Sequence, residues 1–114
     1  FELHAKFEEI YTDLVEKVDE IAERILTLGH TPANGFSQYL SQSRIKEEIA
    51  VSTAADCLKG TLDGFKVLLG QQREILSLAN DADDEGTASQ MSDYIKEQEK
   101  LIWMFQAACQ SCRG

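Results

Sequence analysis

The sequence predicts an all-α protein built from three long helices and one short one. Three stretches carry apolar residues three or four positions apart, the spacing that places side chains on one side of an α-helix. The connections between them differ greatly in length, since the first pair is joined by a long segment and the second pair by a tight acidic turn. Long helices with unequal connections favour a helical bundle with one crossover.

The first stretch predicts a helix that ends near Gly29, where a glycine is expected after the last helical turn. Its apolar positions are Leu3, Phe7, Ile10, Leu14, Val18, Ile21, Ile25 and Leu28. Such a helix is about 40 Å long, well above the average in globular proteins. Phe1 begins in the middle of this pattern, without an initiating Met or a capping residue. We therefore expect residues 1–114 to be a single domain truncated at its N-terminus.

The second and third stretches predict helices of similar length, from about Thr53 to Asn80 and from about Glu85 to Ser111. The second offers Leu58, Leu62, Phe65, Leu69, Ile75 and Leu76 for burial. The third offers Met91, Tyr94, Ile95, Leu101, Ile102, Phe105 and Cys109.

The two connections decide which bundle this is. The acidic corner at residues 81–86 is so short that the helices on either side must be antiparallel neighbours. The segment from Gly29 to Ser52 can extend to about 75 Å, enough to cross the full length of the bundle. Within it, Phe36, Tyr39 and Leu40 predict a short helix that packs down. This pattern describes a ferritin-like four-helix bundle whose first helix would precede Phe1.

Composition excludes several classes of protein. The 114 residues carry 20 acids against 11 bases, and a net charge of −9 argues against nucleic acid as a partner. No run approaches the roughly 20 apolar residues of a membrane span, and no signal peptide is recognisable. Three cysteines, including the pair Cys109 and Cys112, are too few for a disulfide scaffold, so we expect a reducing, cytoplasmic setting.

The first helix has a third sector between its apolar stripe and its polar face. The polar face consists of Lys6, Glu9, Asp13, Glu16, Lys17, Glu20 and Arg24. The third sector holds His4, Glu8, Asp19 and Glu23, interleaved with Val15, Ala22 and Leu26. Because carboxylates rarely alternate with valine and leucine on a solvated face, we expect a second buried face whose polar groups need partners.

The spacing of these polar groups limits the kind of site they can form. His4 and Glu8 are four residues apart, as are Asp19 and Glu23, so each pair points the same way. The pairs lie about 22 Å apart along the axis, so they can meet only when a second copy of the helix packs antiparallel across a two-fold axis. One imidazole with several carboxylates suits iron or manganese better than structural zinc. A salt-bridged helix with its charges in solvent would show the same spacing.

The segment from Phe1 to Arg24 closely resembles the Dps family of mini-ferritins. Members carry F-x-L-H-x-x-F-E-x-x-Y followed by D-x-I-A-E-R, and the likeness extends through residues 92–104. The resemblance implies a hollow dodecamer that binds iron, oxidises Fe(II) with peroxide and stores the ferric product. It assigns His4 and Glu8 as iron ligands from one chain and Asp19 and Glu23 as those from its two-fold mate. A further family histidine would lie twelve residues before His4.

The acidic corner looks like the mouth of a three-fold iron-entry pore of this family, which would concentrate Fe(II) through its electric field. Its acids are Asp81, Asp83, Asp84 and Glu85. A solvated turn with helix-capping acids fits the same residues. We expect Trp103 in the core or at an interface. The alternative function is a structural shell that protects DNA with little ferroxidase activity, although no basic tail is visible here.

Overall fold

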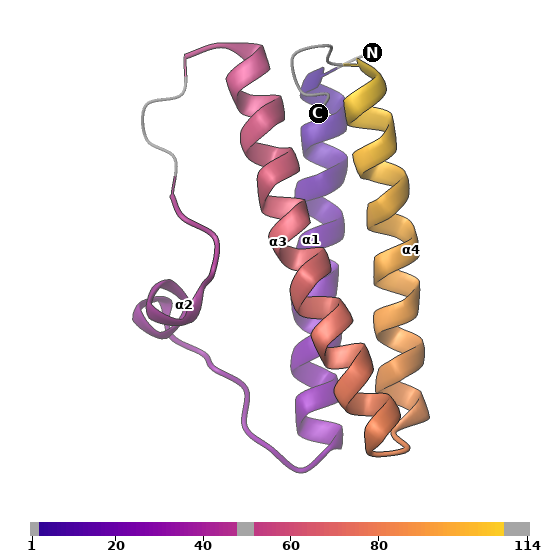
Figure 1. Ribbon diagram of the computed structural model, residues 1–114. Helices are drawn as coiled ribbons and strands as arrows, with labels where there is room; N and C mark the ends of the chain where they lie inside the picture. Colours follow the sequence, from indigo (N-terminus) through magenta and orange to yellow (C-terminus); the bar gives the residue numbers. More distant parts are fainter. Residues whose placement is uncertain (1–2, 48–51, 109–114) are drawn as a thin grey trace. The chain divides into compact units, whose positions relative to one another are not determined.

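The computed structural model describes residues 3–47 and 52–108, and their regular structure is entirely helical. The helices are α1 (Leu3–Thr27), α2 (Phe36–Gln42), α3 (Ala54–Asp81) and α4 (Glu85–Ala108), shown in Figure 1. The all-α prediction is therefore confirmed, including the short helix within the crossover. The predicted continuation of α4 to Ser111 lies outside the described residues.

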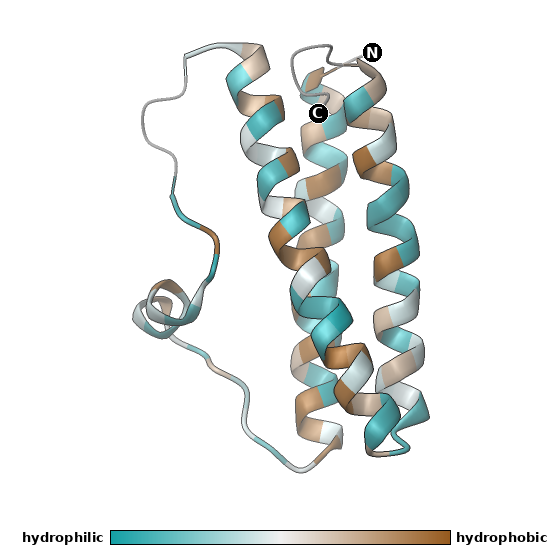
Figure 2. Cartoon of the chain, viewed as in Figure 1, coloured by the Kyte–Doolittle hydropathy of each residue, from teal (hydrophilic) through white to brown (hydrophobic). Residues whose placement is uncertain are grey.

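The chain divides into two compact units, residues 1–43 with α1 and α2, and residues 44–114 with α3 and α4. In Figure 2, apolar and polar bands follow one another along the three long helices, as expected for helices with one apolar side. Among the described residues, no helix is long and apolar enough to cross a membrane.

The end of α1 is set by a backbone motif around Gly29. The His30 N–H donates to the Ile25 carbonyl and the Gly29 N–H to the Leu26 carbonyl, both at 3.0 Å. This pair of bonds is a Schellman motif, which requires a left-handed residue after the helix. Gly29 has φ of 87°, which glycine adopts without steric cost, so the predicted stop is confirmed.

Helix α2 forms where its aromatic residues predicted it, with its start held by Gln38. The Gln38 Oε1 accepts hydrogen bonds from the backbone N–H groups of Asn34 and Gly35, both at 3.1 Å. The rings of Phe36 and Tyr39 meet edge to face with centroids 6.1 Å apart. Phe36 and Leu40 nevertheless remain 85% and 75% exposed, so the expectation that these side chains pack down is wrong for the single chain.

Helices α3 and α4 form an antiparallel hairpin, as the short acidic corner predicted (Figure 1). A second Schellman motif closes α3, since the Asp84 N–H donates to the Ala79 carbonyl at 2.8 Å and the Asp83 N–H to the Asn80 carbonyl at 3.2 Å. Asp83 takes the left-handed conformation with φ of 56°, which aspartate tolerates better than most residues. The turn is tight because this one residue reverses the chain.

The hairpin is held together by a seam of buried residues at heptad-like spacing. On α3 these are Leu58, Leu62, Phe65, Leu69, Gln72 and Ala79, and on α4 they are Ala88, Met91, Tyr94, Gln98 and Phe105. Full burial of one large apolar side chain contributes about 1.5–3 kcal/mol, so Leu62 and Phe105, at 1% and 0% exposure, stabilise the hairpin strongly. Outside the seam, Arg73 Nη2 donates to Glu99 Oε2 at 3.0 Å.

Several burial assignments on α1 and α3 differ from the sequence prediction. Lys17, placed on the polar face, is 6% exposed, whereas Val18, placed in the apolar stripe, is 65% exposed. Lys17 can be buried because its Nζ lies 2.6 Å from Asp13 Oδ2 one turn earlier, which compensates its charge. On α3, Ile75 is 41% exposed although the sequence offered it for burial. Trp103 on α4 is 66% exposed in the single chain, which leaves an interface as its predicted position.

Candidate metal centre

Helix α1 carries all four predicted iron ligands on one uninterrupted stretch, Leu3–Thr27. Because the helix is continuous, His4 and Glu8 stay one turn apart, as do Asp19 and Glu23, and the two pairs remain about 22 Å apart along the axis. All four residues are exposed in the single chain. Each pair is therefore open to solvent and to other molecules.

The carboxyls of Asp19 and Glu23 interact directly. A hydrogen bond with the Asp19 side chain raises the pKa of Glu23 above its usual value, and the negative charge of Asp19 raises it further. The two carboxyl groups therefore lie close enough for one cation to contact both of them. A cation bound there would compete with protonation of the pair.

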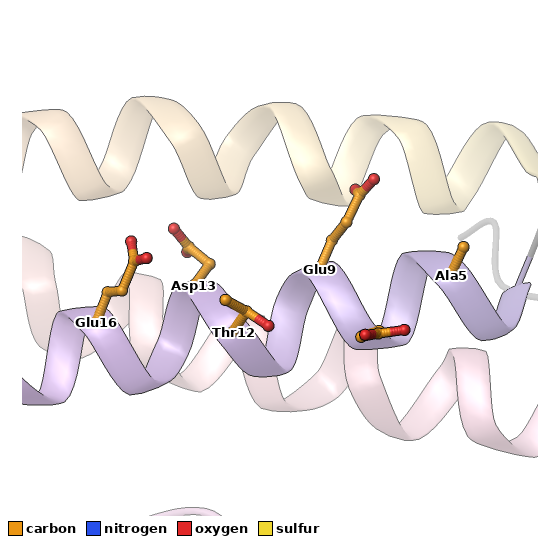
Figure 3. A pocket seen from close by; sticks show the side chains of 6 residues that line it. Ala5, Glu9, Thr12, Asp13 and Glu16 are labelled. Carbon is orange, nitrogen blue, oxygen red and sulfur yellow. The ribbon is translucent and has the colours of Figure 1, made fainter.

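Glu8 of the other pair lines an open groove of about 440 Å³ on α1, whereas His4 does not. Its lining residues are Ala5, Glu8, Glu9, Thr12, Asp13 and Glu16, and Figure 3 shows Glu9, Asp13 and Glu16 extending along the same side of the helix. Two of its four acids are paired with lysines, since Lys6 Nζ lies 3.0 Å from Glu9 Oε2 and Lys17 binds Asp13. The sequence analysis placed Glu9, Asp13 and Glu16 on the polar face and only Glu8 among the predicted ligands, although the three- and four-residue spacing of these acids could have identified the groove.

Within residues 3–47 and 52–108, no group of three or more His, Cys, Asp or Glu side chains lies close enough to hold a metal ion. The single chain thus places the predicted ligands in two separate pairs, His4 with Glu8 and Asp19 with Glu23. Cys57 is a half-buried free thiol near the start of α3, and the pair Cys109 and Cys112 lies outside the described residues.

The acidic corner contains one residue with a clear structural role. The Asp84 Oδ1 accepts a hydrogen bond from the Thr87 N–H at 3.1 Å, and Oδ2 accepts from the Thr87 hydroxyl at 2.6 Å. This is the geometry of a helix N-cap, so Asp84 satisfies a backbone donor at the start of α4. Asp81, Asp83 and Glu85 are exposed around it. The capping interpretation therefore holds for Asp84, and a cation-binding role would have to coexist with it.

Comparisons with known proteins cover the whole chain. The ferritin-like domain family matches residues 1–114. An uncharacterized protein of Haemophilus influenzae is 77% identical over 114 residues, which are 100% of this chain and 71% of that protein. The DNA protection during starvation protein of Porphyromonas gingivalis is 43% identical over 107 residues, covering 94% of this chain and 67% of that protein.

A solved structure agrees with these sequence matches. The Dps protein of Vibrio cholerae, described as a member of a broad superfamily of ferritin-like diiron-carboxylate proteins, superposes with a TM-score of 0.88 at 57% identity. The match covers 91% of this chain and 65% of that one, so the chain spans about two thirds of the length of its relatives. On the whole-chain family match, the shared sequence and the shared fold, the chain belongs to the Dps family of ferritin-like proteins.

Proposed function

We propose that this protein oxidises Fe(II) with hydrogen peroxide, at centres shared between two-fold-related subunits, and stores the ferric product in a hollow cytoplasmic dodecamer. Membership in the Dps family supports iron storage or DNA protection as the general function. One observation carries the finer proposal. Two pairs of ligand-type residues stand about 22 Å apart on a single continuous helix.

The donor set fits iron. His4 supplies an imidazole nitrogen, and Glu8, Asp19 and Glu23 supply carboxylate oxygens. Carboxylates and imidazole together suit Fe(II), whereas structural zinc prefers a set rich in cysteine and histidine. The raised pKa of Glu23 agrees with this, because it reports two carboxylates close enough to bind one cation between them.

A second chain supplies the missing half of each centre. When two copies of α1 pack antiparallel across a two-fold axis, His4 and Glu8 of each copy face Asp19 and Glu23 of the other. The sector around these ligands supports such packing, since Val15 and Leu26 are 53% and 60% exposed in the single chain. Contiguous apolar side chains rimmed by charged groups are typical of protein interfaces.

The reaction then needs only positioning and charge compensation from the protein. Two Fe(II) ions give one electron each to one hydrogen peroxide molecule, which takes up two protons and yields two water molecules. The carboxylates hold the ions together and compensate the added positive charge as Fe(III) forms. The acids Asp81, Asp83, Asp84 and Glu85 would gather Fe(II) at the entry pore before oxidation.

Mixing two inactive variants tests whether the centres are shared. In an assembly of His4→Ala chains or of Asp19→Ala chains alone, every centre lacks a ligand. In a mixed dimer, one centre collects both lesions and the other collects none. Random mixing makes about half of the dimers mixed, so about a quarter of all centres should recover. The measurement is the rate of Fe(II) oxidation by peroxide after the two variants are refolded together.

The matched control mixes His4→Ala with Glu8→Ala, whose lesions lie in the same pair. Every centre then keeps a lesion, so no mixture of these chains should recover activity. Equal recovery in both mixtures, or none in the first while all variants assemble normally, contradicts a centre divided between His4 with Glu8 and Asp19 with Glu23.

The second candidate function is a DNA-protecting shell with little ferroxidase activity. The name of the Porphyromonas gingivalis relative favours it. The net charge of −9 opposes direct binding to phosphates, which requires clustered Lys and Arg. A gel-shift experiment at low salt and an Fe(II) oxidation assay on the same wild-type assembly separate the two candidates, because retarded DNA together with little oxidation would favour the shell.

A further inference from the structure

The hairpin of α3 and α4 contains a buried polar cluster that iron chemistry does not use. Gln98 is 1% exposed and Gln72 is 7% exposed, and both occupy seam positions where the neighbouring buried residues are largely apolar. Among the described residues, neither polar atom of Gln98 has a hydrogen-bond partner, and the Oε1 atoms of Gln72 and Gln90 have none either. Buried amides are nearly always hydrogen-bonded, so four such atoms in one hairpin need an explanation.

Gln72 and Gln98 lie at the same level of the hairpin, whereas Gln90 lies two turns of α4, about 12 Å, from Gln98. Gln72 and Gln98 directly precede Arg73 and Glu99, whose side chains meet at 3.0 Å across the two helices. Gln90, Tyr94 and Gln98 are four residues apart on α4, so they follow one another along one side of that helix. The Gln90 Nε2 already donates to the Tyr94 hydroxyl at 2.9 Å.

In this structure the amides of Gln72 and Gln98 do not bond to each other. Within the described part of the chain, the buried atoms without a partner are the Oε1 atoms of Gln72, Gln90 and Gln98 and the Nε2 of Gln98. An amide nitrogen offers two hydrogens and an amide oxygen accepts two hydrogen bonds, so the buried amide of Gln98 has both a donor and an acceptor unused. A small molecule that donates and accepts at once would satisfy it.

We propose that Gln72, Gln90 and Gln98 form a binding site for internal water between α3 and α4. Water supplies two donors and two acceptors, so one molecule can pair with an amide nitrogen and an amide oxygen at once. A water molecule between Gln72 Oε1 and Gln98 Nε2 would accept from the nitrogen and donate to the oxygen. Its second hydrogen would reach the Oε1 of Gln98 directly, and further water would be needed to reach the Oε1 of Gln90.

Replacement by methionine tests the proposal, because methionine keeps the length of glutamine and removes its polar atoms. If water links the two amides, Gln72→Met and Gln98→Met should each lower the melting temperature of the assembled protein by about 4 °C, the shift expected from losing one net hydrogen bond. The double variant should lose clearly less than the sum, since the first substitution already removes the shared water. Gln71→Met is the control for added hydrophobicity, because Gln71 lies next to Gln72 on α3 at a half-buried position outside the cluster.

A crystal structure of the full assembly at a resolution that shows ordered water provides a readout independent of stability. Density within hydrogen-bond distance of both Gln72 Oε1 and Gln98 Nε2 is expected, and its loss in Gln98→Met. The proposal is overturned if each methionine variant raises the melting temperature with additive effects, because the amides would then be unsatisfied. It is also overturned if the crystal structure shows the amides bonded to protein groups alone.

Discussion

Removing the Asp84 side chain separates two roles that the acidic corner combines. In the structure this carboxylate caps α4 through the Thr87 N–H at 3.1 Å and the Thr87 hydroxyl at 2.6 Å. An N-cap aspartate replaced by alanine costs about 1 kcal/mol, and the lost negative charge at a helix N-terminus adds about 0.3–1 kcal/mol. We therefore expect Asp84→Ala to lower the free energy of unfolding by about 1–2 kcal/mol.

Asparagine at the same position isolates the charge from the cap. Asparagine is as good an N-cap residue as aspartate, so Asp84→Asn should lose at most the charge contribution of about 0.3–1 kcal/mol. Thr87→Val keeps the backbone donor and removes the hydroxyl. Its free energy of unfolding should therefore lie between those of wild type and Asp84→Ala. Urea denaturation of the three variants measures this order. An Asp84→Ala protein that unfolds at the wild-type midpoint would refute the capping argument.

The same variants report on iron entry. If the Asp84 carboxylate attracts Fe(II), Asp84→Ala and Asp84→Asn should slow the initial uptake of Fe(II) equally at low salt, because both remove the charge. If Asp84 is a cap alone, Asp84→Asn should take up iron at the wild-type rate. In stability, Asp84→Asn should exceed Asp84→Ala, whereas in uptake the two variants should be equal if the charge attracts Fe(II). Comparing the two measurements therefore shows whether the carboxylate acts as a cap, as an iron attractor or as both.

Four further outcomes follow from the residues described above. Replacing Asp81, Asp83 and Asp84 together by asparagine should slow Fe(II) uptake at low salt, because the negative charges that attract the ion are lost. The assembly should stay intact, since asparagine tolerates both the left-handed conformation at position 83 and the N-cap at position 84. Unchanged uptake would show that this corner is not part of the pore. Asp19→Asn should lower the pKa of Glu23 toward its usual value, because it removes the charge that favours the protonated form, and carbon-detected NMR titration of the carboxyl measures it. In wild type, Fe(II) binding at this pair should weaken as pH falls through the raised pKa, since protons then compete with the metal. Light scattering should show an assembly of about twelve chains, whereas a stable monomer would contradict the shared centre.

Local patterns in the sequence predicted the helices well. The three- and four-residue spacing of apolar positions determined where α1, α3 and α4 lie, and Gly29 marked the end of α1 through its left-handed conformation. The pairing of Asp19 with Glu23 is equally local, because residues four apart on a helix are always neighbours. These features depend on contacts within one or two turns, and the sequence specifies such contacts directly.

The tertiary structure decided which side chains are buried. Lys17 is buried and Val18 exposed, the reverse of what their hydrophobicity predicts, and Trp103 is exposed although it is the largest apolar residue of the chain. The buried amides of Gln72 and Gln98 gave no signal in the sequence, since glutamine on a helix is ordinarily a surface residue. Burial depends on which surfaces the helices turn toward one another. Burying a lysine or an amide costs free energy at that position. The fold remains stable because the packing of many neighbouring side chains, together with a local partner, contributes more than that cost.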